Sequence, residues 1–406
     1  MFRKINFFIL QGIVIAVPAS LIFYYALNSG ALADNDYWTS VSDVLTVQGG
    51  FSTHISDWVM RNNEHYVLLP KLVYAANIAI SGGSNVGLSL FCWLVALLQV
   101  FILYRIIPVK YQQQPVLFIA LLFAVAIFLF SPRHAHNWIL GMSGTAWLTA
   151  NFFALGAIFT LQYYAQTQRQ VYFWMTFVFS LCALATYSTS LALFPSLLIG
   201  GFLLKLRRRD QVLLAIFSVV MVSLYLLSYS KPAGHPAIQS SMSALVTYIV
   251  AFIGALFNDK LSPALFSGAF GLISSVLMTI YIYRQKAFWQ VSIPWICIQL
   301  YVCANAAMAA LARSGWGVEQ AFSSRYSALP ALFWLSWIML ASCICLQQRR
   351  VYRQLALFIL LAVSSMIVFN TYRIGMLSAK KLLERAERKS FVLASIYAHA
   401  YDVDLI

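Results

Sequence analysis

The sequence predicts an all-α, polytopic helical membrane protein with about eleven transmembrane helices (ten to thirteen), and three observations support this class. Of the 406 residues, 61% are hydrophobic and only 10% are charged, so a soluble domain of this length would lack the polar surface to cover its core. Apolar runs of roughly 18 or more residues recur from end to end. The alternating segments of about 10 residues that form a membrane-spanning barrel are absent.

The first apolar run follows Arg3 and Lys4 and extends from Ile5 to Leu27. A secretory signal has an apolar core of only about 7–15 residues, whereas this run is long enough to cross a bilayer. We therefore expect a retained signal-anchor helix over 6–27.

The remaining spans follow from the same criterion. They are predicted at 86–105, 115–131, 143–165, 171–187, 189–204, 212–230, 262–283, 290–311, 329–346 and 355–372. Two further apolar stretches, 66–80 and 243–257, are short for a span and carry polar residues such as Lys71. They are predicted to be interfacial or re-entrant helices in the outer loops.

The distribution of charge supports this threading. With the N-terminus in the cytoplasm, the inner loops are rich in Lys and Arg and contain Asp210 as their one acid, while acids and bases balance in the outer loops up to residue 328. This is the pattern of the positive-inside rule. The net charge of +15 therefore reports topology, and nucleic acid is not an expected partner.

One transmembrane domain is predicted over 1–373, with 28–85 as a long first extracytoplasmic loop that contains an interfacial helix. An amphipathic C-terminal tail follows over 374–406. The six cysteines all lie within apolar runs without ligand spacing, so they are expected to be small buried hydrophobes.

The first outer loop contains Asp57, Arg61, Glu64 and His65, a spacing that would align them on one face of a helix. For Asp57 and Arg61 a solvated face is the favoured interpretation. Glu64 and His65 adjoin the apolar "YVLLP" and should lie at headgroup depth, where such groups are costly unless paired or functional. Both interpretations stay open for this pair.

Two more polar clusters lie in outer loops. "SPRHAHNW" contains Arg133, His134 and His136, which are typical phosphate ligands beside a helix N-terminus, while a metal site at the two histidines would need further ligands. "ARSGWGVEQAFSSRYS" contains Arg313 and Arg325. Arg325 is expected either to reach the lipid headgroups or to bind the phosphate of a lipid-linked substrate.

Directly after the first span, "ADNDYW" places Asp34 and Asp36 in the outer loop. With the cytoplasmic N-terminus and the long first external loop, this arrangement resembles the GT-C class of integral-membrane glycosyltransferases. By size and topology the chain is similar to the bacterial and phage-encoded O-antigen glucosyltransferases within that class.

The resemblance implies a GT-C-like domain over 1–373 that uses a polyprenyl-phosphate sugar as donor, with a first-loop carboxylate as general base. Asp36 is favoured for that role over Asp34. The predicted substrate-binding residues are Arg325, Arg313, Arg133, His134 and His136 for the phosphate, with Glu64 and His65 orienting a sugar. No motif calls for a cofactor, although the pattern is compatible with a divalent metal ion.

The predicted function is transfer of a sugar to an envelope glycan such as O-antigen, or to a lipid-linked acceptor, on the periplasmic face of a bacterial inner membrane. Three alternatives stay open: a lipid or polysaccharide transporter or flippase, a polysaccharide polymerase or ligase, and a membrane acyltransferase. Spans nearly free of charge weigh against ion-coupled transport. The motifs of soluble nucleotide-binding enzymes, serine hydrolases and zinc proteases are absent.

Overall fold

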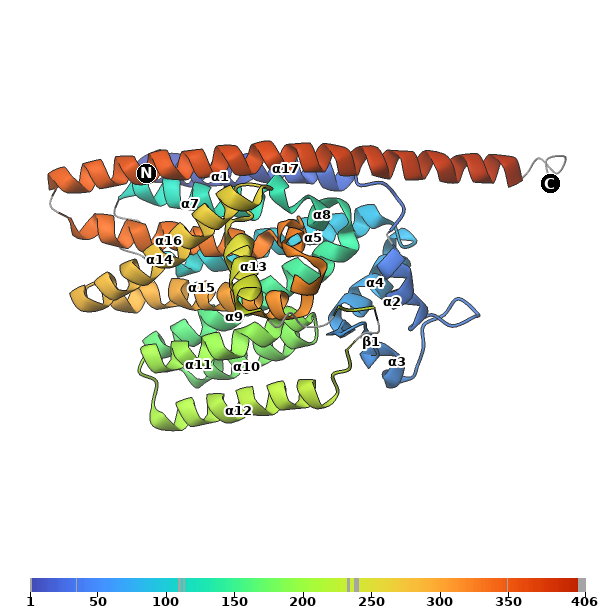
Figure 1. Ribbon diagram of the computed structural model, residues 1–406, viewed down its shortest axis with the longest axis horizontal. Coiled ribbons are helices and arrows are strands. Elements are labelled where there is room, and N and C mark those ends of the chain that lie inside the picture. Colours follow the sequence, from blue (N-terminus) through green and yellow to red (C-terminus); the bar gives the residue numbers. More distant parts are fainter. Residues whose placement is uncertain are drawn as a thin grey trace.

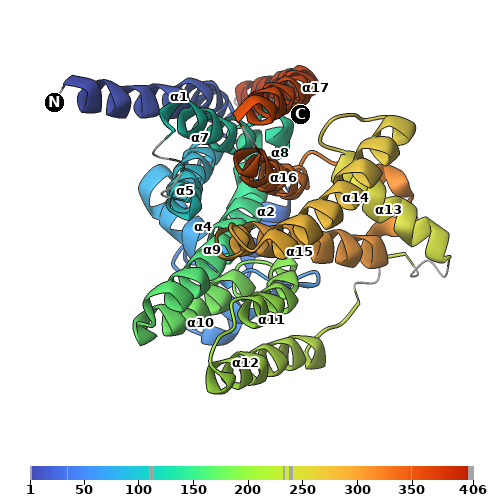
Figure 2. The ribbon, with the colours of Figure 1, turned by 90° about the vertical axis from the view of Figure 1, so that its left-hand side faces the viewer.

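The computed structural model describes residues 2–33, 35–108, 111, 114–231, 234–236, 241–348 and 350–400, and these form a bundle of helices (Figures 1 and 2). The elements in chain order are α1 (Phe2–Leu27), α2 (Asn35–Ser42), α3 (Ile55–Val59), β1 (Arg61–Asn62), β2 (His65–Tyr66), α4 (Leu68–Ser81), α5 (Asn85–Ile106), α7 (Pro115–Leu129), η1 (Pro132–His134), α8 (Ala135–Ile139), α9 (Gly141–Thr167), α10 (Gln170–Leu184), η2 (Ser188–Ala192), α11 (Leu193–Leu203), α12 (Arg208–Leu227), α13 (Met242–Gly254), α14 (Leu261–Gln285), α15 (Trp289–Arg313), η3 (Ser314–Trp316), η4 (Val318–Phe322), α16 (Ala328–Gln347) and α17 (Arg350–Ala400).

The helices confirm the class of polytopic helical membrane protein. Within the described ranges, nine helical segments are long and apolar enough to cross a membrane, and they correspond to nine of the eleven predicted spans. The other two predicted spans, 171–187 and 189–204, correspond to the shorter helical segments α10 and η2–α11. The stretches expected to be too short to span are α4 and α13.

Burial distinguishes central from peripheral helices. In the most apolar windows of α9 and α16, 83% of the residues are buried, against 22% in α12 and α14. Figure 2 shows α9 and α16 enclosed by their neighbours and α12 at the edge of the bundle. The peripheral helices expose large apolar side chains such as Phe266 and Leu227, which is the surface that lipid tails cover.

Small residues allow two helices to cross at backbone contact. A Cβ on Gly254 of α13 would collide with the carbonyl of Ala264, and a Cβ on Gly268 of α14 would collide with the carbonyl of Val250. Close approach through small residues is a common way to associate helices in lipid, where burial of apolar surface gives little driving force.

The first loop folds at one end of the bundle. Figure 1 shows α2, α3, α4 and the β1–β2 hairpin gathered there, and we call this the hairpin end. Asn85, which is buried at the start of α5, links the chain segment that follows α1 and the C-terminal end of α8 to α5 by hydrogen bonds. The Asn85 amide group donates to the carbonyls of Ser29 (3.1 Å) and Ile139 (2.9 Å) and accepts from the N–H of Gly141 (2.9 Å).

The helix suggested by the spacing of Asp57, Arg61, Glu64 and His65 does not form. The helix α3 ends at Val59, and a two-residue turn then joins β1 to β2, pairing Asn62 with His65. Asn63 in that turn has φ 53°, a left-handed conformation that asparagine tolerates better than most residues. Asn63 therefore favours the hairpin over a continued helix.

The predicted C-terminal tail continues the last span. Residues 374–400 belong to α17 without interruption, and 401–406 lie outside the described residues. Gly375 lets α17 approach closely, since a Cβ there would lie 2.3 Å from the backbone nitrogen of Arg133.

Lys71 of α4 fastens the middle of the first loop. Its ammonium group is fully buried and forms an ion pair with Asp43 (2.9 Å). It also donates to the carbonyls of Asp57 (2.9 Å) and Met60 (3.0 Å). A charge removed from water in this way is stable only because every donor has a partner.

We predict that Lys71→Met loosens residues 43–60, because Asp43 and two carbonyls lose their shared donor, at a cost of about 3 kcal/mol. Hydrogen exchange should accelerate in 43–60, and the melting temperature should fall. Lys260→Met, at an exposed lysine, is the matched control. Equal exchange in the two variants would contradict the prediction.

Candidate functional site

The β1–β2 hairpin presents Glu64 and His65 at the hairpin end. Arg61 anchors the hairpin to the end of α12, where its guanidinium donates to the carbonyl of Tyr225 (2.9 Å) and to Ser228 Oγ (2.7 Å). The same guanidinium lies over the rings of Tyr66 and Tyr225, at 4.2 and 4.6 Å from their centroids. Arg61 therefore positions the hairpin on α12, whereas the sequence favoured a solvent-exposed helix face for this residue.

Glu64 and Arg313 form an ion pair at the centre of this region. Arg313 Nη2 donates to Glu64 Oε1, and only 11% and 16% of the two side chains are exposed. His65 Nε2 lies 3.4 Å from Oε1, and His235 Nε2 lies 3.6 Å from Oε2. Arg313 Nη1 also contacts His235 Nε2 at 2.8 Å. One carboxylate thus joins the first loop to the C-terminal end of α15.

His65 is a neutral imidazole in this setting. Burial, followed by the positive charge of Arg313, holds its pKa well below the ordinary value of 6.5. Its ring stacks on Tyr187, with the centroids 3.8 Å apart, and its Nδ1 pairs with Ser188 Oγ. Because Nε2 faces the Glu64 carboxylate, the proton belongs on Nε2, so Nδ1 accepts from the serine hydroxyl.

Asp36 and Arg325 flank this cluster. Asp36 lies exposed in the first turn of α2, and the hairpin holds α2 in place because Asn62 donates to Ser40 Oγ (2.6 Å). Burial lowers the pKa of Arg325, but interactions with Tyr326 and Tyr187, and to the least extent with Asp36, outweigh burial and raise that pKa. Asp36 therefore lies on the same side of the cluster as Arg325 and contributes weakly to its electrostatic setting.

Arg325 is a cation of the site without an ion pair among the described residues, as is Arg61, whose guanidinium is instead held by α12 and two tyrosine rings. The Arg325 guanidinium lies 5.1 Å from the centroid of the Tyr326 ring, and its buried Nε has no hydrogen-bond partner. Among the described residues it forms no ion pair, unlike Arg313 and Arg133. A partly buried guanidinium without an acid can receive an anion from outside the chain.

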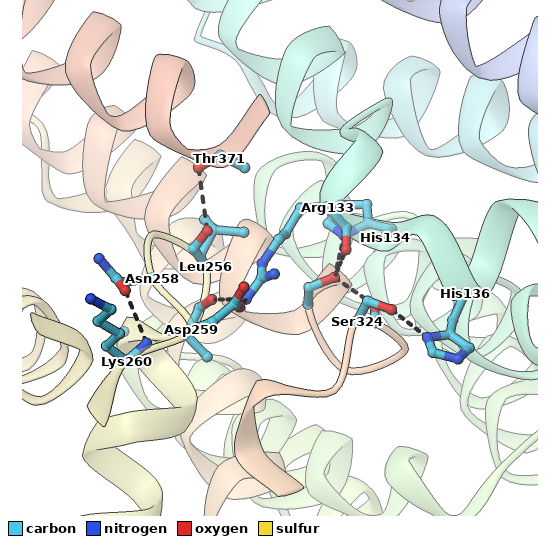
Figure 3. Close-up of polar contacts among 12 residues, drawn as sticks. Arg133, His134, His136, Leu256, Asn258, Asp259, Lys260, Ser324 and Thr371 are labelled. Carbon is cyan, nitrogen blue, oxygen red and sulfur yellow. Dashed lines mark hydrogen bonds and ion pairs between the residues drawn. The ribbon is translucent and has the colours of Figure 1, made fainter. Parts of the chain in front are cut away.

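The residues of the second predicted cluster brace the loop that carries Arg325 (Figure 3). His134 Nδ1 pairs with Ser327 Oγ (2.7 Å), and His136 Nδ1 pairs with Ser324 Oγ. Asn137 donates to the carbonyl of Arg325 (3.0 Å). The predicted cluster around His134 and His136 and the predicted cluster that contains Arg325 are thus in direct contact.

Arg133 Nη2 and both ring nitrogens of His134 are bonded within the protein, whereas Arg133 Nε is buried without a hydrogen bond among the described residues. Arg133 forms an ion pair with Asp259 and donates to the carbonyl of Ala255 (2.7 Å). His134 uses its second nitrogen on the carbonyl of Phe128 (2.9 Å). Figure 3 shows the Arg133 side chain directed towards Asp259 and His136 on the other side of the loop.

The predicted site residues therefore divide into three groups. Contacts and electrostatic interactions join five of them: Asp36, Glu64, His65, Arg313 and Arg325. His134 and His136 support the neighbouring loop through their side chains, and Arg133 supports it through its backbone carbonyl. Asp34 lies outside the described residues.

Sequence reasoning did not single out Tyr187, Ser188 or Tyr248 as site residues. The polar "TYSTS" between two apolar runs was a signal for the first two, since a polar break at a helix junction marks a solvated or functional position. Tyr248, whose buried hydroxyl has no hydrogen bond among the described residues, had no such signal, because it lies within an apolar stretch.

Metal binding stays a prediction. Within the described residues, no group of three His, Cys, Asp or Glu side chains could hold a metal ion. Glu64, His65 and His235 come together around Arg313, whose positive charge opposes that of a cation.

Comparison with known proteins gives little guidance. No protein-family profile matches the chain, and no curated protein sequence matches it. A crystal structure of ArnT from Cupriavidus metallidurans bound to undecaprenyl phosphate is similar, with a TM-score of 0.49 and 13% sequence identity. The match covers 92% of this chain and 76% of that chain. A likeness this distant carries no inference about chemistry, which rests on the residues described above.

The neutral state of His65 predicts a pH dependence of stability. Below about pH 6.5 an unfolded histidine takes up a proton that folded His65 does not, so stability is complete above that pH and is lost as the pH falls. As the pH falls from 7.5 to 5, the melting temperature should decrease less for His65→Gln than for the wild type. In the wild type, His65 lowers the free energy of unfolding by up to about 1.4 kcal/mol per pH unit over this range. His54→Gln, at an exposed histidine, should keep the wild-type profile. Parallel profiles for the wild type and His65→Gln would contradict the assignment.

Proposed function

We propose that the protein is a membrane glycosyltransferase that moves a sugar from a polyprenyl-phosphate donor to an envelope glycan such as O-antigen. The observation that carries the proposal is Arg325, a half-buried guanidinium that has no acidic partner among the described residues and whose Nε is buried without a hydrogen bond. The exposed carboxylate of Asp36 lies on α2, which the neighbouring hairpin holds. An anion receptor beside a free base is the pair that such a transfer needs.

In the proposed reaction, Asp36 accepts the proton of an acceptor hydroxyl as that oxygen attacks the anomeric carbon of the donor sugar. The new carbon–oxygen bond forms while the bond from the anomeric carbon to the phosphate oxygen breaks, and the electron pair leaves with the polyprenyl phosphate. Arg325 stabilises the negative charge that develops on this leaving group. The proton remains on Asp36 until it passes to water.

Glu64 and Arg313 have a supporting role in this proposal. Because they neutralise each other, Arg313 adds little net attraction for a phosphate. The Glu64 carboxylate is held in the ion pair with Arg313, so it is a poorer candidate than Asp36 for accepting the proton. Their pairing supports the division of labour in which Asp36 moves the proton and Arg325 binds the anion.

We further propose that the hairpin end faces the periplasm of a bacterial inner membrane, as the charge distribution of the loops favours. A polysaccharide polymerase or ligase would use the same anion receptor and base. The acceptor that turns over in the assay below distinguishes these enzymes.

We predict that Arg325→Gln raises the Kd for undecaprenyl phosphate about 10-fold or more, because charge-assisted hydrogen bonds to phosphate are lost. Titration of the lipid against the full-length protein in nanodiscs measures this change. Arg284→Gln, at an exposed arginine at the C-terminal end of α14, should leave the Kd unchanged. An unaltered Kd in Arg325→Gln would overturn the assignment of the phosphate site.

We predict that Asp36→Asn lowers the rate of sugar transfer about 10²- to 10⁴-fold, because the amide cannot accept the proton. The Kd for undecaprenyl phosphate should stay within about twofold of the wild type. Radiolabelled transfer from lipid-linked sugar to glycan in membranes measures the rate. Glu319→Gln, at an exposed acid of the neighbouring loop, is the control, and full activity in Asp36→Asn would exclude Asp36 as the base.

A further inference from the structure

A cavity of about 320 Å³ lies next to the Glu64–Arg313 pair, between the start of α13 and the η3–η4 segment. Its lining residues are Ser243, Ala244, Thr247, Tyr248, Ser314, Gly317 and Val318. Ser314 directly follows Arg313 in the chain, so the cavity opens beside the cluster described above.

The cavity is lined by hydroxyl groups, two of which have no partner. Four of its residues carry a hydroxyl: Ser243, Thr247, Tyr248 and Ser314. The Tyr248 hydroxyl and Ser314 Oγ are buried without a hydrogen bond among the described residues, and the Tyr248 side chain is fully buried. An unsatisfied buried hydroxyl costs roughly 1–3 kcal/mol, so two of them on residues that line one cavity favour a hydrogen-bonding occupant.

The electrostatics of the cavity favour a neutral ligand. None of the lining residues carries a charge. Phe252 follows Tyr248 by one turn of α13, and its ring packs against that of Tyr326, with the centroids 5.9 Å apart. Tyr326 is next to Arg325 in the chain, so the cavity lies near the proposed phosphate position. The Arg313 charge is already balanced by Glu64, so an anion would bind at Arg325, while the cavity beside it suits hydroxyls.

Size and lining together describe a sugar ring. Ala244 and Val318 add apolar surface to the four hydroxyl groups, and a sugar likewise combines apolar C–H faces with hydrogen-bonding edges. A volume of 320 Å³ is at the low end for a ligand pocket, enough for one ring rather than an oligosaccharide.

We propose that this cavity holds one neutral sugar residue, hydrogen-bonded by Tyr248 and Ser314, next to a phosphate bound at Arg325. The proposal rests on the proposed function, since a lipid-linked sugar presents both groups together. The sugar comes either from the donor or from the acceptor glycan, and both present the same hydroxyl chemistry.

The test uses Tyr248→Phe, which removes one hydroxyl and keeps the ring, in the full-length protein in nanodiscs. Kd values are measured for undecaprenyl phosphate and for its glucosyl, galactosyl and mannosyl derivatives, and the KM for the acceptor is measured in the transfer assay. Thr247→Val is a second variant that removes another lining hydroxyl. Tyr229→Phe, at an exposed tyrosine, is the matched control, and melting temperatures confirm folding.

For a donor sugar, Tyr248→Phe should weaken binding of one glycosylated lipid about 3- to 10-fold and leave undecaprenyl phosphate within twofold of the wild type. For an acceptor sugar, the KM for the acceptor should rise by a similar factor, while all lipid Kd values stay unchanged. Thr247→Val should change the same quantity in the same direction.

The sugar site is refuted if every Kd and the acceptor KM of both variants match those of Tyr229→Phe, because the cavity then holds water rather than a sugar.

Failure of the proposed function gives a different result, in which the wild type does not bind undecaprenyl phosphate. Saturation-transfer NMR with methyl glycosides of the three sugars then tests the cavity alone. A signal that Tyr248→Phe does not reduce refutes the sugar site.

Discussion

The ion pair between Glu64 and Arg313 is the contact on which the arrangement at the hairpin end depends. The two residues are 249 positions apart in the chain, and each is largely withdrawn from water. Either charge alone would be costly at that depth, so each requires the other. Their contact brings the hairpin against the C-terminal end of α15. The chain continues from there to Arg325. The hairpin also holds α2, which carries Asp36, through the bond from Asn62 to Ser40.

Buried polar groups, rather than apolar packing, define the geometry at this end of the bundle. Apolar burial is non-directional, and in lipid it contributes little to the association of helices. Directional bonds at Asn85, Lys71 and His134 fix where the chain enters and leaves the bundle. The site therefore lies on loops, but those loops are as closely tied as the helices. Several buried polar atoms of this part of the described chain lack a hydrogen bond, among them Arg325 Nε, the Tyr248 hydroxyl and Ser314 Oγ.

The sequence predicted the spans well because lipid imposes a length and an apolar composition that can be read locally. It failed where tertiary contacts decide. The helical spacing of Asp57, Arg61, Glu64 and His65 was consistent with a helix, but the Asn62–Asn63 corner forms a hairpin that packs on α12. Arg133 looked like a phosphate ligand, yet its acid, Asp259, is 126 positions away in a segment that no local pattern connects to it. The convergence of the outer clusters could be expected in outline, whereas the partner of each cation could not.

The most direct test of this account is a double-mutant cycle on Glu64→Gln and Arg313→Gln, with the Kd for undecaprenyl phosphate and the melting temperature as readouts. If the pair assembles the site, each single variant weakens lipid binding and stability, and the double variant is little worse than either one. The coupling should then be about 1–3 kcal/mol. Effects that add to within about 0.5 kcal/mol would show that the two residues act independently, and would contradict the claim that their contact joins the first loop to the Arg325 segment.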